Sequence, residues 1–390
     1  MLISIILILF ILFVIFYYFE IHPYVVQKFN GRYYLMNHKS SIENFKRLVL
    51  KAALKISKNE VPKMSLADNT FFPIVFMRTL AIKFNNNHRL KNSFPRAYLL
   101  NGIFDYANSI NDEQTINKLE KTLDPLVVEL KSSSRINFID QVSMGLVLLK
   151  LYEINNRDDY RNACTLLINH LIESIDSQYQ IILYRKNEKF HYVDVIGMIC
   201  PFLLKYAEIF NREDLIELSN KQLEFYIERG LSKSRFPFHG MELSNHMPIG
   251  SSNWGRGLGW YMLGLSATIA YTDVKSNKKY HYFKNELDLL VKNLELCQKD
   301  HYWGQFLGIT KKWHVDTSSS CMIFYSLKLA GIEMDNLKFY DFIKTKTLKN
   351  GFVYYTSGDT EDINLYSREY GKSELTQGLL LSIYSTEKNN

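Results

Sequence analysis

A repeat of apolar helices rich in small residues is the feature that most restricts how this chain can fold. Strand-like alternation is scarce, and helical periodicity dominates after residue 38. The apolar segments recur at intervals of roughly 45 to 60 residues, which is typical of stacked supersecondary units. They begin near Phe94, Phe138, His191, Asn253, Val315 and Gly371.

A more polar helix follows each of the first five apolar segments. Four of these polar helices are expected at Asp112–Ser132, Arg157–Ile175, Glu213–Arg229 and Lys278–Gln298. The sixth apolar helix, Ser373–Ser385, reaches the chain end without a polar partner, and the helix Ser40–Ser57 could supply one.

Six inner and six outer helices with meeting ends describe an all-α fold, the α/α six-barrel or six-hairpin toroid. Inner helices of such a ring are buried on nearly all sides, which explains their Gly, Ala and Ser content, whereas outer helices need one apolar stripe. An open α-solenoid would also show helix pairs. The expected pairing of the first and last helices favours the toroid. Polar residues that could form a site at the starts of the inner helices favour it as well. The less regular stretch Lys58–Asn92 is expected to add helices or a lid.

Composition excludes several classes of protein. Hydrophobic residues make up 47% of the 390 residues, so the chain is not disordered. The net charge of +7 is spread along the chain without a basic stripe, so nucleic acid is not an expected partner. The four cysteines form no CxxC pair, which favours free, buried thiols and argues against zinc. They are Cys164, Cys200, Cys297 and Cys321.

The N-terminus has the composition of a membrane segment. Leu2 to Phe19 is an apolar run interrupted only by Ser4, nearly as long as the roughly 20 residues that span a bilayer. The run lacks the basic start and small-residue cleavage site of a signal peptide. We therefore expect residues 1–20 to be a single-pass anchor and residues 21–390 to be the toroid domain. The basic residues that follow the run favour a cytoplasmic location for that domain, without excluding the other side.

The segment from Ser252 to Leu265 contains the clearest candidate binding residues. Trp254, Arg256 and Trp260 lie where a Gly-rich loop turns into an apolar helix. Arg256 and Trp260 are four residues apart and share a helix face. A guanidinium beside an indole suits a sugar that bears a carboxylate. All four Trp lie within sixty residues, as in a carbohydrate cleft lined by rings, although Trp also fills protein cores.

Other polar residues open the equivalent helices of the repeat and would converge on one mouth of a ring. Asp140 opens the second and Asp194 the third, so these carboxylates are candidates for general acid–base catalysis. Aromatic and apolar neighbours favour a buried Asp194 with a raised pKa. Asp316 opens the fifth helix and is better explained as a helix cap. His239 lies in the loop before Arg256 and could hydrogen-bond a substrate.

Together these segments resemble the unsaturated uronyl hydrolases, glycoside hydrolase families 88 and 105. YVDVIGMICPFLL (192–204) is similar to their D-x-x-x-M-x-x-P-F-L segment, and NWGRGLGW (253–260) to their W-x-R-x-x-G-W segment. DTSSSCM (316–322) resembles E-T-S-x-(S/T)-A-M with Asp for Glu, and residues 138–152 resemble the helix of their first aspartate. The similarity covers about residues 94–386.

The resemblance implies the α/α six-barrel fold and hydration of a terminal unsaturated uronic acid. It implies that Asp194 is the general acid and base and Asp140 its partner carboxylate. It further implies that Arg256 and Trp260 line the sugar site, with His239 beside them. Trp254, in the same segment as Arg256, is a further candidate for substrate binding. No metal or cofactor takes part in the implied reaction.

Two departures leave an alternative open. Family members often have a His at the position of Leu183 here, and an N-terminal anchor is unusual in a depolymerising hydrolase. An anchored toroid would suit exopolysaccharide or capsule assembly, where it could bind glycan or catalyse a different reaction. In either case the expected partner is an oligo- or polysaccharide, and Arg256 favours an acidic one.

Overall fold

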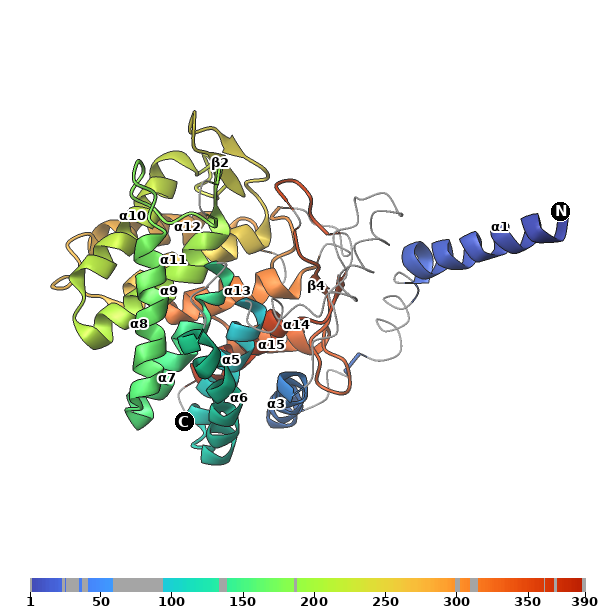
Figure 1. Cartoon of the computed structure of the whole chain (residues 1–390), viewed down its shortest axis with the longest axis horizontal. Helices are drawn as coiled ribbons and strands as arrows, with labels where there is room; N and C mark the ends of the chain where they lie inside the picture. The colour runs from blue at the N-terminus through green and yellow to red at the C-terminus, as the bar shows by residue number, and fades with distance from the viewer. Residues whose placement is uncertain are drawn as a thin grey trace.

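The computed structural model describes residues 2–22, 25, 35–36, 41–58, 94–132, 139–185, 188–298, 302–308, 315–360, 362–367 and 370–387. Within these ranges the chain is built mainly of α-helices, arranged as an α/α toroid (Figure 1). The stretch expected to add helices or a lid falls largely on residues 59–93, which lie outside the described ranges.

Six inner helices in the described part of the chain form the ring. Each packs against the next, and the last returns to the first. They are α5 (Phe94–Ser109), α7 (Met144–Asn155), α9 (Val193–Phe210), α11 (Gly255–Tyr271), α13 (Thr317–Leu329) and α15 (Glu374–Ser385). The prediction of a closed toroid is therefore confirmed, and the open solenoid is excluded. The second inner helix differs from its expected start, because a 3-10 turn, η3 (Ile139–Gln141), precedes α7.

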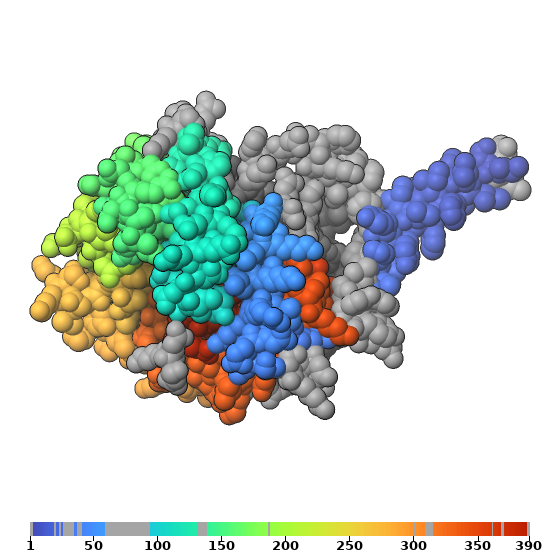
Figure 2. All heavy atoms as spheres, turned by 90° about the horizontal axis from the view of Figure 1, so that it is seen from below, coloured from blue at the N-terminus to red at the C-terminus, as the bar shows by residue number. Residues whose placement is uncertain are grey.

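The outer layer consists of helices that lie next to the inner helices in the sequence. It contains α3 (Ile42–Lys58), α6 (Glu113–Ser132), α8 (Asp158–Glu173), α10 (Glu213–Arg229), α12 (Tyr280–Glu295) and α14 (Asn336–Lys344). As predicted, α3 packs against α15 and α5 and so provides the missing sixth partner. Figure 2 shows α3 in blue at the surface beside the teal segment that contains α6. Its buried Phe45, Val49 and Ile56 follow the spacing of one helical stripe.

Ring closure depends on two glycines. Gly102 of α5 and Gly378 of α15 face each other, and a Cβ atom on Gly102 would overlap the carbonyl oxygen of Gly378. A Cβ on Gly378 would in turn overlap the carbonyl oxygen of Tyr98. Only glycine permits two backbones to approach this closely. The small residues of the inner helices thus set the distance between the first and last helices of the ring.

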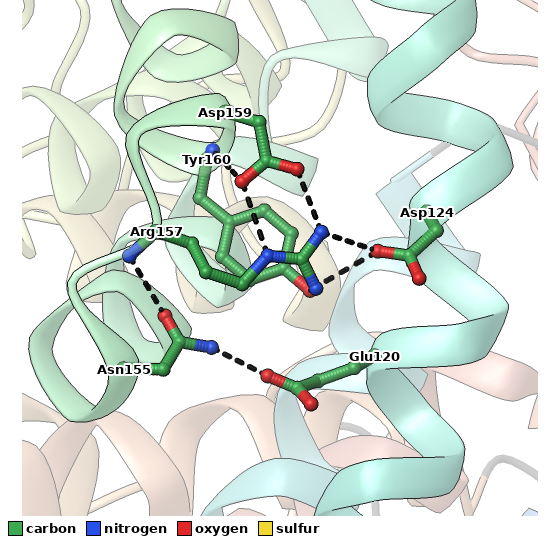
Figure 3. Close-up of polar contacts among 6 residues, drawn as sticks. All are labelled: Glu120, Asp124, Asn155, Arg157, Asp159 and Tyr160. Carbon is green, nitrogen blue, oxygen red and sulfur yellow. Dashed lines mark hydrogen bonds and ion pairs between the residues drawn. The ribbon is translucent and has the colours of Figure 1, made fainter.

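Polar contacts join neighbouring helical pairs at the outside (Figure 3). Arg157, at the start of α8, donates to Asp124 of α6 at 2.8 Å and to Asp159 at 2.6 Å. The Asn155 side chain at the end of α7 donates to Glu120 of α6. Because these groups are partly exposed, we expect them to orient the helices more than to stabilise them.

Two small sheets lie at the starts of the inner helices. One contains β1 (Phe190–Tyr192), β2 (Gly240–Glu242) and β3 (Pro248–Ile249) in the order β1-β2-β3, with both pairs antiparallel. The other pairs β4 (Thr356–Ser357) with β5 (Tyr370–Gly371). The alternation in the sequence was too short to predict these strands.

The prediction of a membrane anchor is wrong. Among the described residues, no helix combines the length and the apolar character needed to cross a bilayer. The apolar run forms α1 (Leu2–Phe16), whose 15 residues are fewer than the roughly 20 required, and a π-helical turn η1 (Tyr17–Ile21) follows it. Three other expectations depended on this anchor and lose their basis. They are the boundary at residues 1–20, the single-pass localisation and the membrane as a partner.

Candidate active site

Asp194 lies in the first turn of α9, immediately after β1. The register of the small sheet pairs Tyr192 with Gly240, so the chain before β2 runs beside the start of α9. The Val193 N–H donates to the carbonyl oxygen of His239 at 3.1 Å. This pairing sets His239 against Asp194, with 3.7 Å between Nε2 and Oδ2. The sheet therefore brings together two of the residues that the sequence singled out.

The environment of Asp194 favours its protonated form. Burial raises the pKa of this carboxyl to about 7, although the Arg256 guanidinium acts in the opposite direction. Within the described residues Oδ2 has no hydrogen-bond partner, yet 17% of the side chain is exposed. A carboxyl with this pKa can hold a proton at neutral pH and release it to a substrate.

His239 is neutral under the same conditions. Burial, reinforced by Arg256, lowers its pKa to about 4. Its ring lies 4.4 Å from that of Trp254, measured between centroids, and only 4% of the side chain is exposed. The contact between His239 and Asp194 at neutral pH is thus one between an uncharged imidazole and a partly protonated carboxyl.

Arg256 lies in the first turn of α11 and is 5% exposed. Its two terminal nitrogens donate to the carbonyl oxygens of Ser357 at 2.8 Å and Gly358 at 2.7 Å. These bonds use two of the five N–H groups of the guanidinium. The guanidinium carbon also lies 5.6 Å from the ring of Trp254, which caps the helix and is 1% exposed. In the described part of the chain, no carboxylate forms an ion pair with Arg256.

Trp260 lies inside the ring wall. Its indole packs against Gly197 of α9 and against Phe94 and Tyr98 of α5, with centroid distances of 5.2 and 5.8 Å, and 1% of the residue is exposed. A hydrogen bond from this side chain also lowers the pKa of Asp194. Trp260 therefore contacts Asp194 from within the packed inner helices, and little of its indole ring is accessible to a ligand.

Asp140 lies in η3, which packs against α9 and α5. The hydroxyl of Ser143, just after this turn, donates to the carbonyl oxygen of Met198 at 3.2 Å and so fastens the turn to α9. Phe138, where the helix was expected to start, lies outside the described residues. The structure thus joins the element of Asp140 to α9, the helix whose first turn contains Asp194.

Asp316 is a helix cap, as predicted. It is fully buried and precedes α13, where its carboxylate accepts hydrogen bonds from the backbone N–H of Ser318 at 2.9 Å and from the hydroxyls of Ser318 and Ser319. It also accepts from the N–H and hydroxyl of Ser357 at 3.2 and 2.7 Å. These bonds fix Ser357 at the end of β4. The carbonyl oxygen of the same residue accepts a hydrogen bond from Arg256.

Sequence reasoning missed Tyr366 and Asp359, which follow β4. The ring of Tyr366 lies 5.6 Å from that of His239 and 5.5 Å from that of Trp254. The charge of Asp359 raises the pKa of Asp194. Neither residue belongs to a periodic segment, so no pattern in the sequence marks them.

The site contains no evident metal-binding group within the described ranges, where no three His, Cys, Asp or Glu side chains are arranged to hold an ion. Cys164, Cys200 and Cys321 are buried and Cys297 is half-buried, and burial raises the pKa of each thiol.

His191 makes stability depend on pH. It is fully buried between the rings of Phe225 and Tyr226, and burial lowers its pKa to about 3. The unfolded chain then binds more protons than the folded one between pH 6.5 and 3, so the free energy of unfolding decreases by about 1.4 kcal/mol for each unit by which the pH is lowered in this range. We expect His191→Phe, which keeps the ring packing, to lose about 1.6 kcal/mol less stability than wild type when the pH is lowered from 6.5 to 5. Chemical denaturation at both pH values measures this difference, and equal losses would contradict it.

Comparison with known proteins gives a consistent result. The model of the family described as Glycosyl Hydrolase Family 88 matches residues 72–349. Among curated proteins, none matches this chain. A family 105 glycoside hydrolase from C. acetobutylicum ATCC 824 is 20% identical, with 80% of this chain and 98% of that chain covered and a TM-score of 0.64.

Two further solved structures are similar in fold. A possible family 105 member from Salmonella enterica serovar Paratyphi A is 14% identical over 90% of this chain and 95% of that chain, with a TM-score of 0.72. An unsaturated glucuronyl hydrolase specific for heparin is 12% identical over 88% of this chain and 96% of that chain, with a TM-score of 0.64. At these identities the likeness establishes the α/α toroid fold.

Proposed function

Since the chain belongs to glycosyl hydrolase family 88, we propose that its ring mouth hydrates the terminal unsaturated uronic acid of an oligosaccharide, with Asp194 as general acid and base. The prediction of a glycoside hydrolase that resembles the unsaturated uronyl hydrolases is confirmed at the level of the family. The observation that supports the proposed role of Asp194 best is its raised pKa of about 7 at a partly open position.

The reaction follows from this protonation state. The Asp194 carboxyl delivers its proton to C4 of the C4=C5 double bond, which leaves positive charge shared between C5 and the ring oxygen. A water molecule adds its oxygen to C5 and returns a proton to the Asp194 carboxylate. The hemiketal that forms then opens and releases the neighbouring sugar. One water is consumed, and the enzyme returns to its starting protonation state.

Asp140 is proposed as the partner carboxylate that orients water or a substrate hydroxyl. The packing of η3 against α9 is compatible with that role. His239 is proposed to hydrogen-bond the substrate beside Asp194, since its uncharged ring has both a donor and an acceptor nitrogen at neutral pH.

Arg256 is proposed to bind the carboxylate of the uronic acid through N–H groups that the Ser357 and Gly358 carbonyls leave unused. Trp254 and Trp260 complete the proposed sugar site. Because both indoles are 1% exposed, we expect them to shape the site through Arg256, His239 and Asp194 more than through stacking on the sugar. The proposed substrate is therefore an acidic oligo- or polysaccharide.

Removal of the guanidinium tests the proposed carboxylate contact. We expect Arg256→Ala to weaken binding of acidic oligosaccharides tenfold or more, because charge-assisted hydrogen bonds contribute about 1.5–3 kcal/mol. Neutral oligosaccharides should lose less. Arg256→Lys is the matched control: it keeps the charge without the planar fork and should retain part of the preference. Calorimetric titrations that show equal weakening for both glycan classes would refute the carboxylate role.

Product analysis tests the proposed reaction. An unsaturated glucuronyl disaccharide and its saturated counterpart, with the same linkage, are each incubated with the full chain. We expect cleavage of the unsaturated compound only, with products whose combined mass exceeds that of the substrate by one water. Equal cleavage of both would indicate ordinary glycoside hydrolysis and contradict hydration.

A role in polysaccharide assembly has less support. It was expected mainly because an anchored toroid would suit such a system, and no described helix is able to span a membrane. Glycan binding without turnover remains the alternative that the same assays distinguish.

A further inference from the structure

The start of α13 is joined to the end of β4 by more hydrogen bonds than a helix cap requires. The Oδ1 atom of the fully buried Asp316 accepts from the backbone N–H groups of Ser318 at 2.9 Å and Ser357 at 3.2 Å. Its Oδ2 atom accepts from the hydroxyls of Ser319 at 2.9 Å and Ser357 at 2.7 Å. A cap needs only the bond to an N–H of the first turn. The bonds to Ser357 therefore call for another explanation.

The residue after Asp316 holds the chain that leads to Ser357. The N–H of Thr317 donates to the carbonyl oxygen of Tyr355 at 3.1 Å, and its hydroxyl donates to that of Tyr354 at 2.9 Å. Tyr355 has a φ of 62°, which a bulky residue rarely adopts. Such a conformation persists where surrounding contacts determine it. The start of α13 thus sets the path of the backbone up to Ser357.

Arg256 is fixed to the same region at both ends. Its guanidinium donates to the carbonyl oxygens of Ser357 at 2.8 Å and Gly358 at 2.7 Å. At its backbone, a Cβ atom on Gly255 would overlap the hydroxyl of Ser319, so the start of α11 lies directly against the start of α13. The orientation of the Arg256 side chain is therefore determined by the first turn of α13.

The two buried charges are joined through Ser357 instead of through an ion pair. The N–H and hydroxyl of Ser357 face the Asp316 carboxylate, and its carbonyl oxygen faces the Arg256 guanidinium. Among the described residues, no carboxylate pairs directly with Arg256. A carboxylate that did so would occupy the planar fork that recognises an acidic ligand. The arrangement holds the guanidinium and leaves part of that fork for a ligand.

We propose that Asp316 is a positioning residue for ligand binding: through Ser357 it fixes the Arg256 guanidinium so that its remaining N–H groups meet an acidic group of the sugar. A side chain that is already ordered loses less conformational freedom when the ligand binds. The contact with the sugar rests on the proposed function of Arg256. The orientation of Arg256 by Asp316 does not.

Three substitutions separate this role from helix capping. Asn caps a helix as well as Asp does, so Asp316→Asn keeps the cap, but an amide nitrogen in place of Oδ2 cannot accept from the Ser357 hydroxyl. Ser357→Ala removes the same bond from the other side and keeps the carbonyl that Arg256 binds. Ser318→Ala is the matched control, because it removes a different hydroxyl bond to Asp316, of 2.6 Å.

The first measurement follows the Arg256 guanidinium by NMR in the full chain labelled with ¹⁵N-arginine. Arg256→Lys assigns its signals by their disappearance. We expect exchange of its N–H protons with solvent to accelerate roughly threefold or more in Asp316→Asn and Ser357→Ala, since a lost hydrogen bond is worth at least that factor. Ser318→Ala should exchange as wild type does.

The second measurement is calorimetric binding of an acidic disaccharide and of its carboxyl-reduced, neutral counterpart. The preference for the acidic compound should fall roughly threefold or more in Asp316→Asn and Ser357→Ala. In an Arg256→Ala background, Ser357→Ala should have no further effect on this preference, because both changes remove the same interaction.

Exchange as slow as in wild type in both Asp316→Asn and Ser357→Ala would overturn the proposal, as would an equal acceleration in Ser318→Ala. If Asp316→Asn does not fold, Ser357→Ala decides alone. Faster exchange with an unchanged preference for the acidic compound would support the orientation of Arg256 by Asp316 and refute the proposed carboxylate contact. The expected changes in a chain without turnover would refute hydration alone.

Discussion

Asp194→Asn is expected to lower kcat by about 10²–10⁴-fold, the usual contribution of general acid–base catalysis. The amide is nearly isosteric with the carboxyl and keeps an oxygen that can accept a hydrogen bond from Trp260, but it cannot deliver a proton to C4. Because the wild-type carboxyl is buried with a pKa of about 7, the neutral amide should be tolerated without loss of stability. Turnover is measured from the absorbance of the double bond, and binding from calorimetric titration.

Two controls make this result specific. Glycan binding and the free energy of unfolding should stay close to wild type, which excludes misfolding as the cause. Asp140→Asn is the matched variant in the neighbouring repeat and should reduce turnover less, since its proposed role is to orient water. If Asp194→Asn is as active as wild type, the general acid is a different residue even though the family is unchanged.

Gly102→Ala is expected to have the largest effect on stability. Its Cβ would overlap a backbone oxygen of α15, which cannot rotate aside as a side chain would, so the first and last inner helices must separate. Overpacking of a core typically costs about 1–3 kcal/mol, and a backbone contact places this variant at the upper end. The free energy of unfolding from urea denaturation measures the loss.

Gly371→Ala is the control for this substitution. Gly371 has no atom within 4 Å of its added Cβ and does not have a positive φ. Its replacement should change the free energy of unfolding by no more than about 0.5 kcal/mol. A Gly102→Ala variant as stable as wild type would show that the α5–α15 contact does not determine ring closure.

The ring could be predicted because its causes are local in the sequence. Small and apolar residues recur at helical spacing, and α3 and α15 each lack a partner along the chain, which makes closure the simplest arrangement. The error at the N-terminus has a local cause too. The apolar run from Leu2 to Phe19 covers 18 residues, but the regular α-helix ends at Phe16 and a π-helical turn follows.

The site could be predicted only in part. Asp194, Arg256 and Trp260 open or line inner helices, so the repeat itself marks them. Sequence reasoning did not predict that the Arg256 guanidinium would hold backbone carbonyls or that Trp260 would be covered by Phe94 and Tyr98.

Asp359 could not be found in this way. It follows two residues, Ser357 and Gly358, that Arg256 and Asp316 hold by hydrogen bonds across 101, 102 and 41 positions of the sequence. Such contacts depend on tertiary packing and leave no periodic pattern. His239 was a candidate from its place in the loop before Arg256, but its position beside Asp194 depends on the register of β1 and β2, which the sequence did not predict.

The most direct test of the central claim follows wild-type protein on a panel of unsaturated uronyl oligosaccharides at the absorbance of the C4=C5 bond. We predict that the absorbance decays with at least one acidic member of the panel, and that the decay slows as the pH rises through about 7, where Asp194 loses its proton. An absorbance that stays constant with every member, while calorimetry detects glycan binding, would contradict hydration and leave a glycan-binding toroid.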